Sequence, residues 1–276
     1  MVEKKANVEK AMPRLEVDGD PDDRDFVTAL SRGFAILRSF RRGERSLGNK
    51  EIAARTGLAK STVARLTYTL TKLGYLEYLS AQEKYALGIG LLNFGQTYLA
   101  GLDVREVARP AMQELAEYAQ GTVALGAPHG LDMVFLELCH GNQMFLMRVA
   151  MGERVPHGRT ALGRAYIAAL TLDQRREFGA AYSKTVKKEE WPKVRESSEQ
   201  ACRDYEKFGF VFSLGDWNRE VYAVGVPMIS ADRSRILAFS CSGPVREMTR
   251  KRIISDIGPR LVKLRNHVLS VLGGNF

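Results

Sequence analysis

The segment NKEIAARTGLAKSTVARLTYTLTKLGYLEYLSAQEKYAL, residues 49–87, decides the fold of the first part of the chain. Its apolar residues recur at three- and four-residue steps over 49–55 and again over 60–73, and a glycine follows each stretch. This pattern predicts two helices joined by a tight turn. Residues 75–79 and 84–87 flank a polar turn and read as a β-hairpin. Two short helices followed by a hairpin indicate a winged helix-turn-helix, which is a DNA-binding arrangement.

The helix predicted over 60–73 has two distinct faces when its residues are spaced by about 100°. One side of this helix carries an apolar stripe. The opposite side carries small polar, basic and aromatic groups, and such a face suits the major groove. The apolar stripe consists of Val63, Leu66, Leu70 and Leu73. The predicted DNA contacts are Lys60, Ser61, Thr62, Arg65 and Tyr68, with Lys84 on the hairpin. For this helix taken alone, an ordinary amphipathic surface helix is the alternative.

Arg65 lies at the middle of the polar face, and arginine is the side chain that most often reads guanine through two hydrogen bonds. A contact with a backbone phosphate is the alternative role for Arg65. Lys60 and Ser61 stand at the helix N-terminus, where a phosphate is favoured by the free backbone N–H groups.

The distribution of charge agrees with a DNA-binding segment. The whole chain has a net charge of +9, and residues 26–100 hold 11 Lys and Arg against four Asp and Glu. A basic segment attracts the phosphate backbone. Charge alone fits a basic solvated surface equally well, but here it coincides with the two helices and the hairpin. The predicted partner is therefore double-stranded operator DNA.

The chain divides into four predicted segments. Residues 1–24 are polar and form a flexible tail, and residues 25–87 form the winged helix-turn-helix domain. Residues 88–102 form a linker helix whose apolar side needs a cover, for which a second copy of the chain is the simplest source. Residues 103–276 form a larger second domain.

The second domain mixes strands with helices. Strands are predicted over 122–127, 133–139, 144–149, 210–214, 222–229 and 236–242. Helices are predicted over 160–170, 172–182, 192–208 and 249–272. This mixture predicts an antiparallel sheet with helices packed on it, so the fold class is α+β.

Composition excludes several classes of protein. No run of about 18 apolar residues occurs, so no membrane span or membrane partner is predicted and the expected location is the cytoplasm. The three cysteines lack the CxxC spacing, which argues against a metal site and against disulfides. Cys139 and His140 are adjacent, so on a strand they face opposite sides and cannot pair as nucleophile and base. Since no catalytic motif is present either, we predict neither an enzyme nor a cofactor.

Several stretches occur in the order found in one family of proteins. They are Ser31–Leu37, Glu51–Leu66, Tyr85–Gly88, Ala108–Pro110, Arg154–Pro156, Thr160–Gly163, Gly225–Pro227 and Ser240–Pro244. On these residues the chain from Phe26 to Gly273 resembles the IclR family of transcription regulators. The resemblance implies a GAF-like second domain with an effector pocket at one end of its sheet. It also implies dimers that often pair into tetramers, and small organic acids or aromatic catabolites as effectors.

The function implied by the resemblance is a transcriptional regulator, expected to be a repressor, whose operator binding responds to a small molecule. A DNA-binding architectural protein without an effector is the alternative. A ligand that changes the affinity for DNA distinguishes the two.

Matching to the family suggests which residues surround the effector. They are Thr160, Ala161, Asp216, Ala223, Ser240 and Ser242. Backbone N–H groups at the start of the helix predicted over 160–170 suit a carboxylate. Ser240 and Ser242 alternate on one face of a strand, so both hydroxyls can reach one cavity, although a structural hydrogen-bonded pair is the alternative. Arg159 is a candidate counter-charge for an acid, with a solvated surface role as its alternative.

The chain departs from the family pattern at positions that bear on the pocket. His157 stands where the family often has leucine, Gly158 where it often has histidine, and Ala223 where it often has cysteine. Arg164 replaces a usual lysine, and Ala59 replaces a better helix cap. The identity of the effector therefore does not carry over from the family.

Overall fold

The structure is a computed structural model, and it describes residues 24–141 and 149–276. The chain forms two compact units, with the division between Tyr98 and Leu99 inside helix α4 (Gly90–Ala100). The tail predicted over 1–24 lies outside the described residues apart from Arg24, and the strand predicted over 144–149 does so apart from Val149.

The first unit contains the two helices and the hairpin predicted over residues 49–87, preceded by one further helix. Its elements are α1 (Thr28–Arg38), α2 (Asn49–Thr56), α3 (Lys60–Lys72), β1 (Leu76–Leu79), the short turn η2 (Ser80–Gln82) and β2 (Lys84–Leu87). One small core holds them together, built from Ile36, Leu47, Ile52, Val63, Leu70 and Leu76. The hairpin is extended by Leu47, which exchanges two backbone hydrogen bonds of 2.8 Å with Tyr85.

The apolar stripe of α3 differs in one respect from the expectation. Leu73 is 60% exposed, whereas Thr67 is fully buried and donates its hydroxyl to the carbonyl of Val63 at 2.9 Å. The buried face is therefore centred on Val63, Thr67 and Leu70, and Leu73 lies at its edge. Satisfying the hydroxyl within the helix lets a polar side chain occupy a core position at low cost.

An ion pair fixes α2 against the loop that precedes it. Both terminal nitrogens of Arg55 contact the carboxylate of Glu44, at 2.6 and 2.8 Å, and one of them also donates to the carbonyl of Ser39 at 2.8 Å. The hydrogen bonds from Arg55 hold the pKa of Glu44 below its usual value. This forked contact sets the start of the helix-turn-helix with the geometric specificity of an arginine–carboxylate pair.

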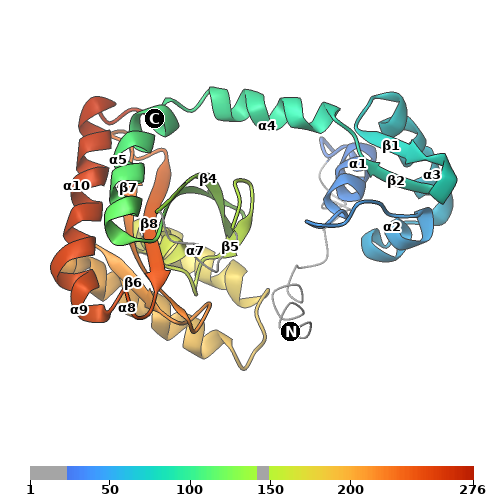
Figure 1. Cartoon of the computed structure of the whole chain (residues 1–276). Coiled ribbons are helices and arrows are strands. Elements are labelled where there is room, and N and C mark those ends of the chain that lie inside the picture. Colours follow the sequence, from blue (N-terminus) through green and yellow to red (C-terminus); the bar gives the residue numbers. More distant parts are fainter. Residues whose placement is uncertain (1–23, 142–148) are drawn as a thin grey trace. The chain divides into compact units, whose positions relative to one another are not determined.

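The second unit is built on one antiparallel sheet of six strands in the order β5-β4-β3-β8-β7-β6 (Figure 1). The strands are β3 (Thr122–His129), β4 (Asp132–His140), β5 (Arg154–Pro156), β6 (Val211–Leu214), β7 (Val221–Ile229) and β8 (Ile236–Pro244). Strands β3, β8 and β7 form its centre and are buried along most of their length.

Helices cover both faces of this sheet, which completes an α+β domain. On one face α5 (Asp103–Ala119) and α10 (Gly258–Val271) pack against the sheet and against each other (Figure 1). On the other face lie α6 (Ala161–Ala169) and α8 (Trp191–Phe208), with α7 (Leu172–Ser183) connecting them in sequence. The larger core fills the α5–α10 side, and a smaller one lies under α6.

The single helix predicted over 249–272 is wrong in detail. It consists of the one-turn helix α9 (Arg250–Arg252), a π-helical turn η3 (Ile253–Ile257) and α10. The wide turn directly precedes Gly258 and Pro259. Because proline has no N–H to give to the preceding turn, the regular helical ladder cannot continue through it, and the π turn absorbs the interruption.

Candidate DNA interface and ligand cavity

Helix α3 presents most of the predicted DNA contacts to solvent. Lys60, Ser61, Arg65 and Tyr68 are exposed, and Thr62 is half-buried. Tyr68 is 63% exposed, and the ammonium group of Lys72 lies 5.5 Å from the centre of its ring. The fully buried Val63 and Thr67 hold the helix by its opposite face, so this polar face is left available to a groove.

The N-terminus of α3 has the chemistry of a phosphate site. Its N-cap is Ala59, which supplies no side-chain hydrogen bond, so the first N–H groups of the helix keep their donor capacity. Lys60 and Ser61 stand beside them. Gly57, with φ of +74°, ends α2 in the left-handed conformation that makes so short a turn before α3 possible.

Lys84 is engaged within the unit. Its ammonium lies 3.0 Å from the carboxylate of Glu51, which also accepts the backbone N–H of Gly48 at 2.8 Å. A phosphate would have to compete with Glu51 for this lysine. The exposed Arg45 and Lys50 precede Glu51 and were not singled out, although the basic composition of this stretch was a usable signal.

A candidate ligand cavity, referred to below as the sheet-end cavity, lies on the α6 side of the sheet. The register of the strands explains its polar lining. Thr122 of β3 pairs with Ser242 of β8, which pairs in turn with Ala223 of β7. Two residues further along the same pair of strands, Ala124 pairs with Ser240. Residues paired across strands share a face, so these small side chains form one shallow floor.

The cavity is small in this structure, with a volume of about 40 Å³. Of the six predicted effector residues, five line it, namely Thr160, Ala161, Ala223, Ser240 and Ser242. Asp216 does not line it. Sequence reasoning missed Thr122, Phe135, Ser213 and Asn218 among the lining residues. The two-residue alternation of β3 was a signal that could have found Thr122.

Two glycines let the first turn of α6 reach the floor of the cavity. A Cβ at Gly225 would lie 2.3 Å from the carbonyl oxygen of Ala161, and one at Gly126 would lie 2.6 Å from the side chain of Leu162. Because no side chain intervenes, the backbone of α6 rests directly on β7. The helix N-terminus is thereby placed in the wall of the cavity.

Most of the polar groups in the cavity wall already have hydrogen-bond partners within the protein. The Thr160 hydroxyl donates to the Pro156 carbonyl at 2.8 Å and accepts the Gly163 N–H at 3.1 Å, and Ser242 donates to the Thr122 carbonyl. The backbone of Ser240 pairs with β3 and β7, but its hydroxyl makes no hydrogen bond with any residue that the structure describes. Its hydroxyl is thus a polar group that a bound molecule can satisfy.

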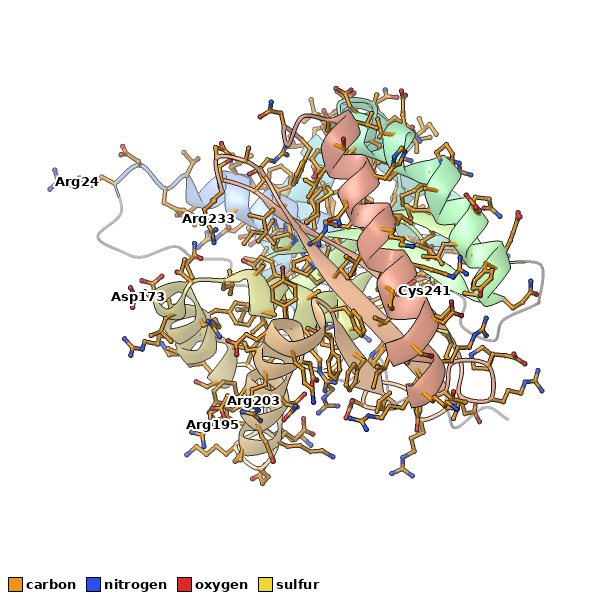
Figure 2. All side chains as sticks on the ribbon, turned by 90° about the vertical axis from the view of Figure 1, so that its left-hand side faces the viewer. Arg24, Asp173, Arg195, Arg203, Arg233 and Cys241 are labelled. Carbon is orange, nitrogen blue, oxygen red and sulfur yellow. The ribbon has the colours of Figure 1, made fainter. Side chains whose placement is uncertain are left out.

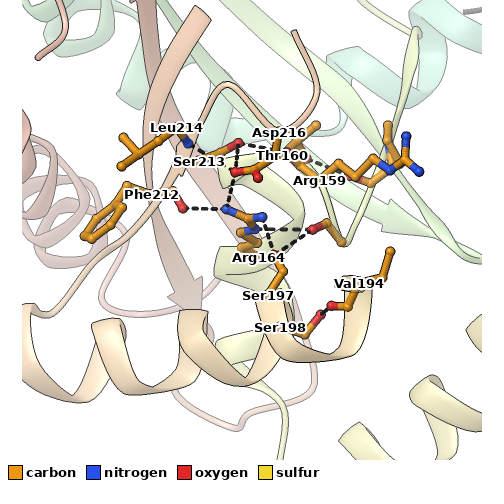
Figure 3. A network of polar contacts seen from close by, with 12 residues as sticks. Arg159, Thr160, Arg164, Val194, Ser197, Ser198, Phe212, Ser213, Leu214 and Asp216 are labelled. Carbon is orange, nitrogen blue, oxygen red and sulfur yellow. Dashed lines mark hydrogen bonds and ion pairs between the residues drawn. The ribbon is translucent and has the colours of Figure 1, made fainter. Parts of the chain in front are cut away.

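Arg164 organises the loop after β6 (Figure 3). Its guanidinium donates to the carbonyls of Gly158 and Phe212, at 3.2 and 2.9 Å, to the Asp216 carboxylate at 3.0 Å, and to the Ser197 hydroxyl. Burial lowers the pKa of Arg164, and the charge of Asp216 opposes that effect. The structure therefore pairs Asp216 with Arg164, and Asp216 is not among the residues that line the cavity.

Neighbouring side chains differ in whether they reach the cavity. Trp217 lines the cavity, whereas Tyr222 packs against the core on the α5–α10 side. Arg159 does not line it and forms an ion pair with Glu190 instead.

His157 is fully buried in an aromatic cluster instead of lining the cavity. Its ring lies 5.0 Å from that of Tyr166 and 4.9 Å from that of Phe178. Neither ring nitrogen has a well-formed hydrogen bond to a described residue. Burial lowers the pKa of His157 to about 4, offset only in part by the backbone at Leu131. The imidazole is therefore neutral at neutral pH.

We expect this histidine to make the fold sensitive to acid. Because the folded-state pKa of about 4 lies below the ordinary 6.5, the unfolded chain takes up the proton first, so stability falls as the pH drops from about 6.5 to about 4. The loss should be about 2 kcal/mol between pH 7 and pH 5. Urea unfolding at both pH values should show this loss for the native chain and a much smaller one for His157→Leu. An equal loss of stability in both proteins would show that His157 is not the group that makes the fold sensitive to acid.

The described residues offer no catalytic pair or metal site. Cys139 is buried, its pKa is raised by burial, and its thiol faces the Arg109 carbonyl at 3.8 Å. His140 lies on the other side of the strand and bonds to Thr122. No cluster of metal-ligating side chains occurs within the described ranges. Within those same ranges, no helix has the length and apolarity needed to cross a membrane.

Comparison with known proteins finds one family over both units. The model of the IclR helix-turn-helix domain matches residues 29–80, and that of the bacterial transcriptional regulator IclR C-terminal domain matches residues 96–266. The HTH-type transcriptional regulator TsaQ1/TsaQ2 of Comamonas testosteroni is 32% identical over 240 residues, which cover 86% of each chain.

Solved structures agree with this similarity. An IclR family transcriptional regulator from Brucella abortus is 40% identical, with a TM-score of 0.83, over 94% of this chain and 97% of that one. An IclR homologue complexed with 4-hydroxybenzoate, from Microbacterium hydrocarbonoxydans, has the same fold, with a TM-score of 0.72 at 19% identity, over 89% of this chain and 99% of that one.

Proposed function

The chain belongs to the IclR family of DNA-binding transcriptional regulators and is not an enzyme, and from this premise we propose that a small molecule in the sheet-end cavity controls its binding to operator DNA. The observation that carries the proposal is the gathering of five predicted effector residues around one cavity. We assign residues 25–87 to DNA binding, 88–102 to the linker and 103–276 to effector binding. The protein would act as a repressor in the cytoplasm, where it meets the chromosome.

The chemistry of the cavity favours a small acid with an apolar or aromatic body. Its walls include Phe135, Leu162 and Trp217, which suit a ring or a short chain. The first turn of α6 offers N–H groups and a positive dipole end to a carboxylate. Ser240 offers a hydroxyl without a described partner. The 4-hydroxybenzoate bound by the Microbacterium homologue is a molecule of this class.

A ligand screen followed by operator binding tests the proposal. Small organic acids and aromatic catabolites, 4-hydroxybenzoate among them, are screened for a rise in melting temperature, and each hit is then titrated into operator complexes. We expect a hit that changes operator affinity and whose binding weakens about two- to tenfold in Ser240→Ala, because one neutral hydrogen bond is lost. Ser255→Ala, far from the cavity, is the matched control. Hits that leave operator affinity unchanged would favour the architectural alternative.

Arg65 is proposed as the base-reading residue of α3. Arg65→Ala should weaken binding to the preferred operator by about 1–3 kcal/mol and relax specificity at one base position. Fluorescence anisotropy with a set of single-base operator variants measures both effects. Equal weakening for every sequence, with a shallower salt dependence, would assign Arg65 to a phosphate instead.

We also propose that two copies of the chain pair through the α1 and α4 region. Helix α4 has no buried residue, and large apolar side chains stand exposed on and before it. These are Ile89, Leu92, Phe94 and Tyr98, and α1 adds Leu30 and Phe34. An exposed apolar surface of this kind needs a partner, and a second copy also matches a palindromic operator. A chain that sediments as a monomer at micromolar concentration would contradict this pairing.

Ligand binding would reach the DNA through the linker. We propose that occupation of the cavity changes the position of α6 on the sheet, and that the change moves the linker helix and alters the spacing of the two DNA-binding units.

A further inference from the structure

A second hollow lies on the outside of the effector domain, between α7 and α8. Its volume is about 510 Å³, compared with about 40 Å³ for the sheet-end cavity measured in the same way. The two hollows share no lining residue. We refer to the second as the α7–α8 groove. Its lining residues come from α7 and α8, with Ile167 of α6 at its base.

The groove has an apolar and aromatic floor. Phe178 and Tyr182 stack with ring centres 5.5 Å apart, and Trp191 lies 6.4 Å from Tyr182. Leu172 and Ile167 extend the apolar surface. A flat hydrocarbon body placed here would remove this surface from water and meet ring faces.

The rim of the groove is positively charged. Arg175 and Arg176 come from α7 and Arg195 from α8, while Glu199 is the acidic residue in the lining and Asp173 pairs with Arg176 at 3.5 Å (Arg195 is labelled in Figure 2). The contact between Arg195 and Glu199 is long, 3.8 Å, and both side chains are more than half exposed. Such a pair contributes little and leaves both groups free to rearrange. The excess of guanidinium groups complements an anion.

Arg175 is the member of this set whose hydrogen bonding is incomplete. Among the described residues, its hydrogen-bond partner is the Cys202 sulfur, 2.9 Å from one terminal nitrogen, and its Nε is buried without a partner. Sulfur is a weak acceptor, whereas a guanidinium fork matches the two oxygens of a carboxylate. An anion in the groove would therefore supply the strong acceptor that the fold does not.

We propose that the α7–α8 groove binds a small organic anion with a flat apolar body, such as an aromatic or fused-ring carboxylate, with its acid group on Arg175. This site is separate from the sheet-end cavity and does not depend on the proposed effector role of that cavity. The two sites touch opposite parts of the same helix, because Ile167 of α6 lines the groove and Ala161 lines the cavity.

Cys202 provides a reporter inside the groove. It is half-buried and lines the groove, whereas Cys139 and Cys241 are 2% and 0% exposed. Iodoacetamide should therefore alkylate Cys202 first in the native full-length chain, and peptide mass analysis identifies the modified residue. With 2-naphthoate as the probe, we expect a saturable slowing of this alkylation, because the bound ring covers the thiol.

Two charge-matched variants decide whether the probe sits on Arg175. Arg175→Gln should raise the 2-naphthoate concentration for half-protection about tenfold or more, because a charge-assisted contact is lost. Arg203→Gln removes the same charge from α8 at a residue that does not line the groove, and it should leave protection unchanged. Each variant is normalised to its own alkylation rate without probe. Should Arg175→Gln fail to fold, Arg195→Gln on the facing rim is the second variant, with weaker protection expected.

Four outcomes would overturn the proposal. They are no protection at millimolar 2-naphthoate, equal protection in Arg175→Gln and Arg203→Gln, and loss of protection in Ser240→Ala, which would place the probe in the sheet-end cavity. The fourth is protection that rises with protein concentration in the absence of probe. That result, supported by sedimentation, would assign the groove to a second copy of the chain.

Discussion

Gly225→Ala is expected to destabilise the effector domain by about 3 kcal/mol, although it adds a single methyl group. The new Cβ would lie 2.3 Å from the carbonyl oxygen of Ala161 and 2.8 Å from its carbon, and backbone atoms cannot rotate away. Either α6 must lift from the sheet or β7 must bend. Alanine also suits a strand better than glycine does, so local propensity alone predicts a gain, and the sign of the change separates the two expectations.

The matched control for this substitution is Gly179→Ala in the same domain. Gly179 lies inside α7, and its Cβ would meet only the ring of Trp191 at 3.7 Å, an ordinary contact. Because alanine is the better helix former, this variant should be neutral or more stable by up to about 1 kcal/mol. Thermal and urea unfolding of both proteins measure the difference. A Gly225→Ala protein as stable as the native chain would show that α6 does not rest on β7.

The displacement of α6 that we expect in Gly225→Ala has a second consequence. The first turn of α6 forms one wall of the sheet-end cavity, so its displacement in Gly225→Ala should weaken any ligand held there even when the domain stays folded. The DNA-binding unit has its own core, so its intrinsic affinity for a half-site should not change.

The DNA-binding unit was predictable from the sequence because its signals are local. Periodicity predicted α2 and α3, and Gly57 and Gly74 follow the last residues of these two helices within two positions. The exposure of Arg65 followed from its angle to Val63 and Leu70 alone. The burial of Thr67 did not follow, because whether a hydroxyl is satisfied inside the helix depends on packing that polarity does not reveal.

The cavity was less predictable because its parts come from distant segments. Matching to the family suggested the start of α6 and the two serines of β8. The position of the loop after β6 could not be inferred in this way, because it depends on the hydrogen bonds that Arg164 makes to four residues in other segments of the chain. Strand β5 was missed because three residues carry no periodicity. Asp216 was assigned to the cavity because a sequence match gives a position in the chain and not the direction of a side chain.

Arg164→Met is expected to cost about 2–4 kcal/mol of stability, because it removes the donors of a buried network while leaving the acceptors in place. The carbonyls of Gly158 and Phe212 would lose their hydrogen bonds, and Asp216 would lose its counter-charge. The Asp216 side chain is 35% exposed, so water can partly replace the arginine there and keeps the cost below that of a fully buried pair.

A lysine at this position separates the charge from the geometry. Arg164→Lys keeps a positive group near Asp216 but cannot donate to Gly158, Phe212 and Ser197 together, since an ammonium lacks the planar fork. We expect about half the loss of stability seen with methionine. Ligand affinity in the sheet-end cavity should also fall in the lysine variant, because Ser213 of β6 and Trp217 and Asn218 of the following loop line the cavity.

A double-mutant cycle with Asp216→Asn isolates the ionic part of the network. If Arg164 acts mainly through Asp216, the double variant Arg164→Met/Asp216→Asn should be little worse than Arg164→Met alone. If it acts mainly through the two carbonyls, the two costs should add. Unchanged stability together with unchanged ligand affinity in Arg164→Lys would show that the loop keeps its position without the fork. The positioning role of Arg164 would then have to be abandoned.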